Sequence, residues 1–205
     1  KKIGLSSQWI EYCKNIRKKY PIVLDEFKTQ KKYLNSYFFI EKLSEKLSSK
    51  DIIVTDMGLS FTGTHQAFKV KKGQKLYTNS GHAPMGWGLP AAIGAYFSGK
   101  KISRVICLAG EGGFQMNIQE LATVMHNKLP IKIFIFNNGG YQTIKQTQQH
   151  RFNNRIMGAN SSSGLSFPNY KKIADSHNLN YLKINNNKQV DKNIDMVLKN
   201  NKPVI

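Results

Sequence analysis

Two oxygen-bearing side chains occupy matching positions in neighbouring predicted strand–turn units. Glu111 follows the apolar run of residues 105–109, and Asn138 follows the apolar run of residues 131–136. Both runs are typical of strands in one β–α–β unit, and ligands of parallel α/β sheets bind at the carboxyl ends of the strands. Carboxylate and carboxamide oxygens suit a hard divalent cation. The spacing therefore predicts a cation site at that edge of a sheet.

Glycines surround the predicted cation site. Gly110 and Gly112 flank Glu111, Gly113 follows, and a helix pattern begins within a few residues. Glycine lets a phosphate approach the backbone closely, and a helix N-terminus presents N–H groups to an anion. An ordinary glycine turn between a strand and a helix is the alternative interpretation of these residues alone.

The segment GEGGFQMNIQELATVMHNKLPIKIFIFNN, residues 110–138, resembles the signature of thiamine diphosphate-dependent enzymes. That signature is a G-D-G triplet separated from an N-N pair by a helix and a strand. Residues 81–94, GHAPMGWGLPAAIG, resemble a segment of the acetolactate synthase and pyruvate decarboxylase group. The resemblance covers roughly residues 36–205 and corresponds to the C-terminal, diphosphate-binding domain of that family.

The resemblance implies magnesium ligands. They are the Glu111 carboxylate, the Asn138 side-chain oxygen and the Gly140 backbone carbonyl. The family residue at position 111 is aspartate, so Glu111 is a departure. Its extra methylene lengthens the reach by about 1.5 Å, which requires the ion or the strand end to shift. A solvent-exposed glutamate in a turn is the alternative interpretation of Glu111.

The resemblance also implies a set of cofactor contacts. One strand-end turn, residues 56–60, resembles the family's D-x-G-x turn near the phosphates, although a simple Asp-capped turn would give the same pattern. The expected cofactor-binding residues are Gly58, Leu59, Ser60, Ala83, Met85, Gly110, Gly112, Gly113, Asn138, Gly140 and Tyr141.

Met85 stands where related enzymes have a bulky apolar residue that wedges between the two rings of the cofactor. A core methionine at a helix start is the alternative. In the family, a glutamate from a separate N-terminal domain of a neighbouring subunit activates the cofactor. No match for that domain occurs in this chain. We therefore expect this chain to hold the metal and diphosphate half of a site and to supply no catalytic residue of its own.

Strand and helix patterns alternate along residues 36–205. This alternation predicts an α/β fold, a parallel sheet of about six strands with helices on both faces. Asn35 and Ser36 are a plausible helix start. Residues 1–35, a helix pattern over 7–19 followed by a linker, are expected to be the tail of a preceding domain. The predicted strands are 52–55, 76–78, 105–109, 131–136, 181–184 and 204 onward, and the predicted helices are 37–47, 85–98, 117–127, 169–177 and 188–199.

Two stretches do not follow this alternation. Residues 146–168 carry no clear period, and we expect a mobile flap over the cofactor there. The chain stops at Ile205 within a predicted strand, and we expect the natural C-terminus to lie beyond it.

Composition narrows the class of protein. The net charge of +19 would suit nucleic-acid binding, but the lysines are scattered among asparagines without an aromatic-interleaved stripe, so we expect no nucleic-acid partner. No run of about 18 apolar residues occurs, so we expect no membrane partner. The two cysteines, Cys13 and Cys107, have no metal-type spacing and indicate no disulfide. We expect a cytoplasmic protein.

The resemblance implies the C-terminal domain of a thiamine diphosphate- and Mg-dependent 2-oxo acid decarboxylase or carboligase, similar to acetolactate synthase. Pyruvate is the expected 2-oxo acid, and the full-length protein is expected to be a homo-oligomer, at least a dimer. The sequence leaves open the donor and acceptor substrates and whether FAD binds. The alternative is a cofactor-free remnant of the fold with a structural or interaction role.

Overall fold

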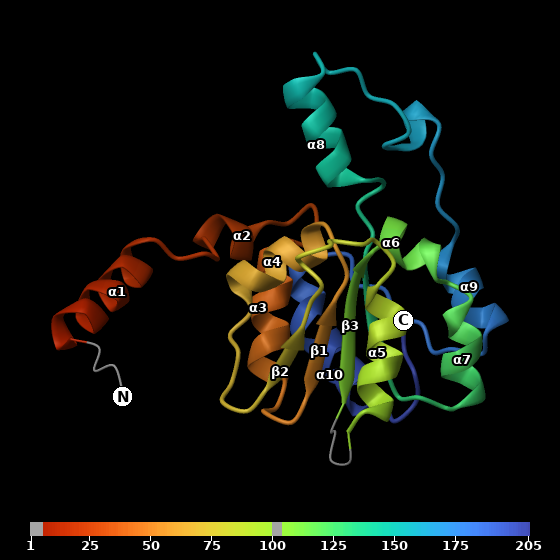
Figure 1. Cartoon of the computed structure of the whole chain (residues 1–205), viewed down its shortest axis with the longest axis horizontal. Coiled ribbons are helices and arrows are strands. Elements are labelled where there is room, and N and C mark those ends of the chain that lie inside the picture. Colours follow the sequence, from red (N-terminus) through yellow and green to blue (C-terminus); the bar gives the residue numbers. More distant parts are fainter. Residues whose placement is uncertain (1–5, 100–103) are drawn as a thin grey trace.

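A computed structural model describes residues 6–99 and 104–205. Its centre is a four-stranded parallel sheet in the order β2-β1-β3-β4 (Figure 1). The strands are β1 (Ile52–Thr55), β2 (Lys75–Tyr77), β3 (Val105–Gly110) and β4 (Lys132–Phe136). Every residue of β1 is buried, as is expected of a central parallel strand covered on both faces. The α/β prediction is confirmed.

The sheet continues past β4 only through single bridges. Val204 pairs in parallel with Lys132 on one side and with Asn180 on the other. The predicted strand at 204 onward is therefore reduced to the bridged residue Val204, and in place of the one predicted at 181–184 only the preceding residue, Asn180, is bridged. The expectation of about six strands is corrected to four strands plus two bridged positions.

Helices cover both faces of the sheet (Figure 1). On one face α3 (Ser36–Lys46), α4 (Leu59–Ala67) and α10 (Val190–Lys199) pack around Ile53, Ile106 and Leu108. On the other face α5 (Gly88–Phe97), α7 (Glu120–His126) and α9 (Tyr170–Ser176) pack around Val54, Cys107 and Ile133. Two short helices complete these layers, α6 (Glu111–Met116) after β3 and the 3-10 turn η2 (Asn187–Gln189) before α10.

Asparagine caps define two helix starts. Asn35 accepts the backbone N–H of Phe38 at the start of α3, and Asn169 accepts that of Lys172 at the start of α9. Such caps satisfy N–H groups that have no partner within the helix. The predicted start near Asn35 is confirmed.

Residues 6–35 form two segments, one that extends away from the sheet and one that is attached to the main domain. Helix α1 (Ser7–Lys19) has no buried residue and extends away from the sheet (Figure 1). The expected linker, residues 21–35, contains a short helix, α2 (Asp25–Thr29). This linker is anchored to the main domain, because Val23 is buried in the core and the Asn187 side-chain amide donates a hydrogen bond to the Phe27 carbonyl at 2.7 Å.

The segment 146–168, where a mobile flap over the cofactor is expected, contains regular structure. Helix α8 (Gln142–Arg151) runs into it, and a 3-10 turn, η1 (Ser161–Ser163), lies within it. Helix α8 buries none of its residues and projects from the carboxyl-end side of the sheet (Figure 1). A helix that is polar all round has no apolar period, so the sequence pattern could not reveal it.

Candidate functional site

A pocket of about 430 Å³ opens at the carboxyl ends of β1, β3 and β4. Three turns form it: residues 57–62 after β1, residues 110–113 after β3, and residues 136–144 after β4. Ser80, Ala83 and Met85 close its remaining side. This is the edge at which open α/β sheets bind ligands.

The Glu111 carboxylate joins two of these turns. Its side chain is only 1 % exposed, which excludes the alternative of a solvent-exposed turn residue. Its Oε1 accepts the backbone N–H of Gly140 at 2.8 Å and that of Asn138 at 3.0 Å. The Oε2 atom shares the Asn138 N–H at 3.2 Å. The structure therefore brings Glu111, Asn138 and Gly140 together as the sequence analysis expected.

The oxygen atoms at this point fit a cation bound together with a diphosphate. A carboxylate has about four acceptor positions. The Oε2 atom of Glu111 uses one of them, to accept the Asn138 N–H that it shares with Oε1. The residues that the structure describes contain no group of three or more His, Cys, Asp or Glu side chains. Glu111 is the one carboxylate among the residues that line the pocket, and a bound Mg²⁺ would need phosphate oxygens or water to complete its octahedron.

Asp56, the first residue of the turn 56–60, is central to the site although it is not among the expected cofactor-binding residues. Its side chain is 1 % exposed, and its oxygens accept the backbone N–H of Gly86 at 3.0 and 3.1 Å. Burial raises the pKa of Asp56, while hydrogen bonds from the backbone of Met57, Gly86 and Gly88 oppose that rise. This carboxylate thus joins the β1 turn to the segment that carries Met85. Its place directly after the apolar strand was the available signal.

Two glycines are required by close approach to neighbouring side chains. A Cβ on Gly112 would lie 1.9 Å from the Tyr141 ring, and a Cβ on Gly113 would lie 1.9 Å from Oδ2 of Asp56. A Cβ on Gly110, by contrast, would meet nothing within 4 Å. A side chain at position 112 or 113 would therefore collide with Tyr141 or Asp56, so the close packing of these two residues requires glycine at both positions.

The Ala83–Gly86 turn holds Met85 at the pocket wall. Ala83 has φ +50°, a left-handed conformation that is uncommon for alanine. Its N–H donates to the Asn79 carbonyl at 2.8 Å, and the Asn117 amide donates to the Gly86 carbonyl at 2.7 Å. These bonds fix the turn from both ends, so Met85 lines the pocket rather than the core.

Nearly all of the expected cofactor-binding residues line this one pocket. Ser60 is the exception, because it is buried and its hydroxyl donates to the carbonyls of Asp56 and Met57. The pocket also has lining residues that the sequence analysis did not name: Met57, Phe61, Thr62, Ser80, Phe136, Gln142, Thr143 and Ile144. The last three begin α8, whose pattern was not recognised.

Comparison with known proteins identifies the family of this chain. Residues 56–205 match the family described as "Thiamine pyrophosphate enzyme, C-terminal TPP binding domain"; thiamine pyrophosphate is another name for thiamine diphosphate. The chain is 30% identical over 197 residues to the acetolactate synthase large subunit of Cyanidium caldarium, covering 96% of this chain and 32% of that protein.

Two further relatives give the same result. The acetolactate synthase large subunit of Porphyra purpurea is 33% identical over 81% of this chain and 30% of its own length. The isozyme 1 large subunit of Escherichia coli K12 is 28% identical over 88% of this chain and 31% of its own length. The chain thus spans about a third of the length of these relatives. Because the family match covers well over half of its residues, the chain belongs to the thiamine pyrophosphate enzymes, as their C-terminal cofactor-binding domain.

Proposed function

We propose that the pocket binds the diphosphate of thiamine diphosphate through one Mg²⁺. The observation that carries this proposal is the direct contact between the Glu111 carboxylate and the Asn138–Gly140 loop. A carboxylate repels a diphosphate, so a cation between the two resolves the repulsion. Glu111, the Asn138 side chain and the Gly140 carbonyl would hold that cation, and the backbone of Gly112 and Gly113 would face the phosphates.

The enzyme that contains this domain is, in our proposal, a 2-oxo acid decarboxylase or carboligase similar to acetolactate synthase. The support is the name shared by the relatives, acetolactate synthase large subunit. Pyruvate is the proposed 2-oxo acid. The glutamate that activates the cofactor would come from another domain of a neighbouring subunit, so we propose a homo-oligomer, at least a dimer, located in the cytoplasm.

The residues of this chain would bind the cofactor and orient it. Thiamine diphosphate, once bound, supplies an electron sink for the decarboxylation of a 2-oxo acid. Met85 would press against the cofactor rings from the pocket wall, and Asp56 would position Met85 through its bonds to the Gly86 N–H.

The domain boundary that we propose lies near residue 36, with residues 1–35 as the tail of the preceding domain.

Isothermal titration of the full-length protein with thiamine diphosphate tests this function. We expect binding in the presence of Mg²⁺ and a loss of that binding when the cation is removed with a chelator. Absence of binding under both conditions would identify the chain as a cofactor-free remnant. Binding of equal strength without a divalent cation would contradict the role proposed for Glu111.

None of the helices in the described part of the chain has the length and apolar character needed to span a bilayer.

A further inference from the structure

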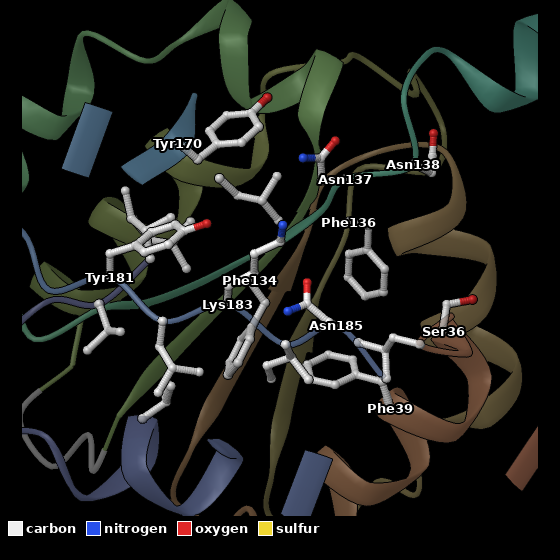
Figure 2. A pocket seen from close by; sticks show the side chains of 18 of the residues that line it. Ser36, Phe39, Phe134, Phe136, Asn137, Asn138, Tyr170, Tyr181, Lys183 and Asn185 are labelled. Atoms are coloured by element: carbon white, nitrogen blue, oxygen red, sulfur yellow. The ribbon is translucent and has the colours of Figure 1, made fainter. Parts of the chain in front are cut away.

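The loop that carries Asn138 and Gly140 borders two cavities. Asn138, Gly140 and Tyr141 line the cofactor pocket. Asn137 and Asn138 stand at the rim of a second cavity, of about 600 Å³ (Figure 2). In the described part of the chain, the position of this loop therefore depends more on a few directed contacts than on packing. The Glu111 carboxylate supplies one such contact, from the turn after β3.

Residues 157–165, the return segment, run back from the end of α8 towards α9 and supply a second contact. Tyr141 donates its N–H to the Ala159 carbonyl at 2.8 Å, and Gly140 forms an antiparallel bridge with Asn160. Ala159 is fully buried, and a Cβ on Gly140 would lie 2.1 Å from its carbonyl oxygen. The return segment thus lies directly against the backbone of Gly140, and this close approach requires glycine there.

Ser163 organises the part of the return segment that makes this contact. Its hydroxyl oxygen accepts the backbone N–H groups of Ala159 and Asn160, both at 3.0 Å. Its hydroxyl proton faces two acceptors, the side-chain oxygen of Asn160 at 2.8 Å and the carbonyl of Asn160 at 3.1 Å. One hydroxyl therefore satisfies the amides of the two residues that contact Gly140 and Tyr141.

Core packing contributes little to the shape of the return segment. Ala159 is the one buried residue among residues 157–165, all of which the structure describes, and α8 before them buries none of its residues. At the exposed end, the Gln148 side chain donates to the Met157 carbonyl at 3.0 Å and accepts the Met157 N–H at 3.2 Å. Because the return segment is held mainly by hydrogen bonds, the loss of one hydroxyl at Ser163 would reach the loop.

We propose that Ser163 is a positioning residue of the cofactor site, which holds Gly140 in place opposite Glu111 through Ala159 and Asn160. The inference rests on the proposed function, because the proposed Mg²⁺ is what requires a fixed Gly140 carbonyl. Mg²⁺ demands near-ideal octahedral geometry, so a loop that shifts lowers the affinity for the ion. Ser163 itself lies outside the lining of the pocket. Its removal therefore changes neither the charge nor the ligands of the site.

The test compares three variants of the full-length protein. Ser163→Ala removes the hydroxyl, and Ser163→Thr retains it. Ser161→Ala is the matched control, at an exposed position of the same 3-10 turn. The first readout is hydrogen exchange of the Tyr141 amide, measured without cofactor. The second is the Mg²⁺ concentration at which binding of thiamine diphosphate is half-maximal, measured by isothermal titration.

We expect Ser163→Ala to speed exchange of the Tyr141 amide by about tenfold, the factor that one hydrogen bond accounts for. The same variant should raise the half-maximal Mg²⁺ concentration by about tenfold, as is typical when a group that orients a metal ligand is lost. At saturating Mg²⁺ its affinity for thiamine diphosphate should return close to that of the unsubstituted protein. Ser163→Thr and Ser161→Ala should stay within about threefold of the unsubstituted protein in both readouts.

Three results would overturn the inference while leaving the proposed function standing. Equal exchange of the Tyr141 amide in Ser163→Ala and Ser161→Ala would show that the hydroxyl does not hold the loop. Faster exchange with an unchanged Mg²⁺ requirement would make Ser163 a purely structural residue. A Ser163→Thr protein as impaired as Ser163→Ala would assign the effect to packing. Failure of the proposed function is distinct, because the unsubstituted protein would then bind thiamine diphosphate without Mg²⁺ or not at all, and the inference would fall with it.

Discussion

The Glu111 carboxylate accepts the backbone N–H of Gly140 at 2.8 Å, across the gap between the turn after β3 and the loop after β4. A glutamate is one methylene longer than the aspartate of the family signature. In this chain the carboxylate also accepts the backbone N–H of Asn138 at 3.0 Å. Glu111 therefore has two separable roles, a structural bond to the loop and the proposed cation ligand.

Substitution of Glu111 separates these roles. Glu111→Gln keeps a side-chain oxygen for the loop amides but removes the negative charge, so we expect the free energy of unfolding to change by less than about 1 kcal/mol. Magnesium-dependent binding of thiamine diphosphate by the full-length protein should weaken at least about tenfold, because a neutral amide is a poorer Mg²⁺ ligand. Urea unfolding and isothermal titration measure the two effects.

The companion variant is Glu111→Ala. It leaves the N–H groups of Asn138 and Gly140 without their acceptor, so we expect a loss of about 1–3 kcal/mol in unfolding free energy together with the loss of cofactor retention. A Glu111→Gln protein that still binds the cofactor with full magnesium dependence would refute the ligand role. A stable Glu111→Ala protein would refute the structural role.

Gly113→Ala tests the close packing beneath the pocket. The new Cβ would lie 1.9 Å from Oδ2 of Asp56, which is itself held by the Gly86 N–H. We expect a destabilisation of about 1–3 kcal/mol, the usual cost of overpacking, measured by urea unfolding.

Gly110→Ala is the matched control, because its Cβ would meet nothing within 4 Å and its φ of −76° is ordinary for alanine. We expect a change below about 1 kcal/mol there. Equal costs at positions 110 and 113 would contradict the packing derived for Asp56.

Met85→Ala tests the pocket wall. The Met85 side chain lines the pocket, while the proposed diphosphate contacts lie in the turns after β1, β3 and β4. We expect the affinity of the full-length protein for thiamine diphosphate to stay within about threefold, whereas turnover of pyruvate falls at least about tenfold because the rings are no longer held in the reactive arrangement. Turnover equal to that of the unsubstituted protein would argue against the wedge.

Lys132 gives the chain a pH dependence unconnected with the site. Its side chain is 1 % exposed and its ammonium donates to the carbonyls of Asn200 and Lys202 at 2.5 and 2.6 Å. Burial, with a smaller contribution from the charge of Arg104, lowers the pKa of Lys132 from 10.5 to about 8. The folded state therefore binds this proton less readily than the unfolded state does. Its contribution to stability is complete above pH 10.5 and is lost as the pH falls through about 8.

The comparison is between the unsubstituted protein and Lys132→Met. We expect the unfolding free energy of the unsubstituted protein, relative to the variant, to fall by about 1–3 kcal/mol between pH 10.5 and pH 7.5. Urea unfolding at several pH values measures this difference. A difference that is constant over this range, or that rises as the pH falls, would contradict the lowered pKa.

The sequence patterns located most elements because local signals were strong. Apolar runs indicated β1, β3 and β4, and the Asn35 cap indicated the start of α3. The composite motif also predicted that candidate residues of three separate turns share one site. In the structure they line one pocket, with Ser60 as the exception. These successes rest on features that occur within a few consecutive residues.

Other features could not be predicted from the sequence, because they depend on contacts between residues that are far apart in the chain. The bonds of Asp56 to Gly86 join residues 30 positions apart, and no local pattern marks them. The bonds of Glu111 to Asn138 and Gly140 likewise join residues 27 and 29 positions apart. Helix α8 was missed because it buries none of its residues. Strands at 181–184 and 204 onward were over-predicted in extent, because the pairing there is limited to single bridges between Val204 and residues 132 and 180.

A crystal structure of the full-length protein with thiamine diphosphate and Mn²⁺ in place of Mg²⁺ tests the central claim most directly. Anomalous scattering would locate the ion independently of the protein oxygens. We expect one manganese peak about 2.0–2.4 Å from a Glu111 oxygen and from the Asn138 side-chain oxygen, with the diphosphate bound to the same ion. A peak elsewhere, or a diphosphate bound away from this loop pair, would contradict the account.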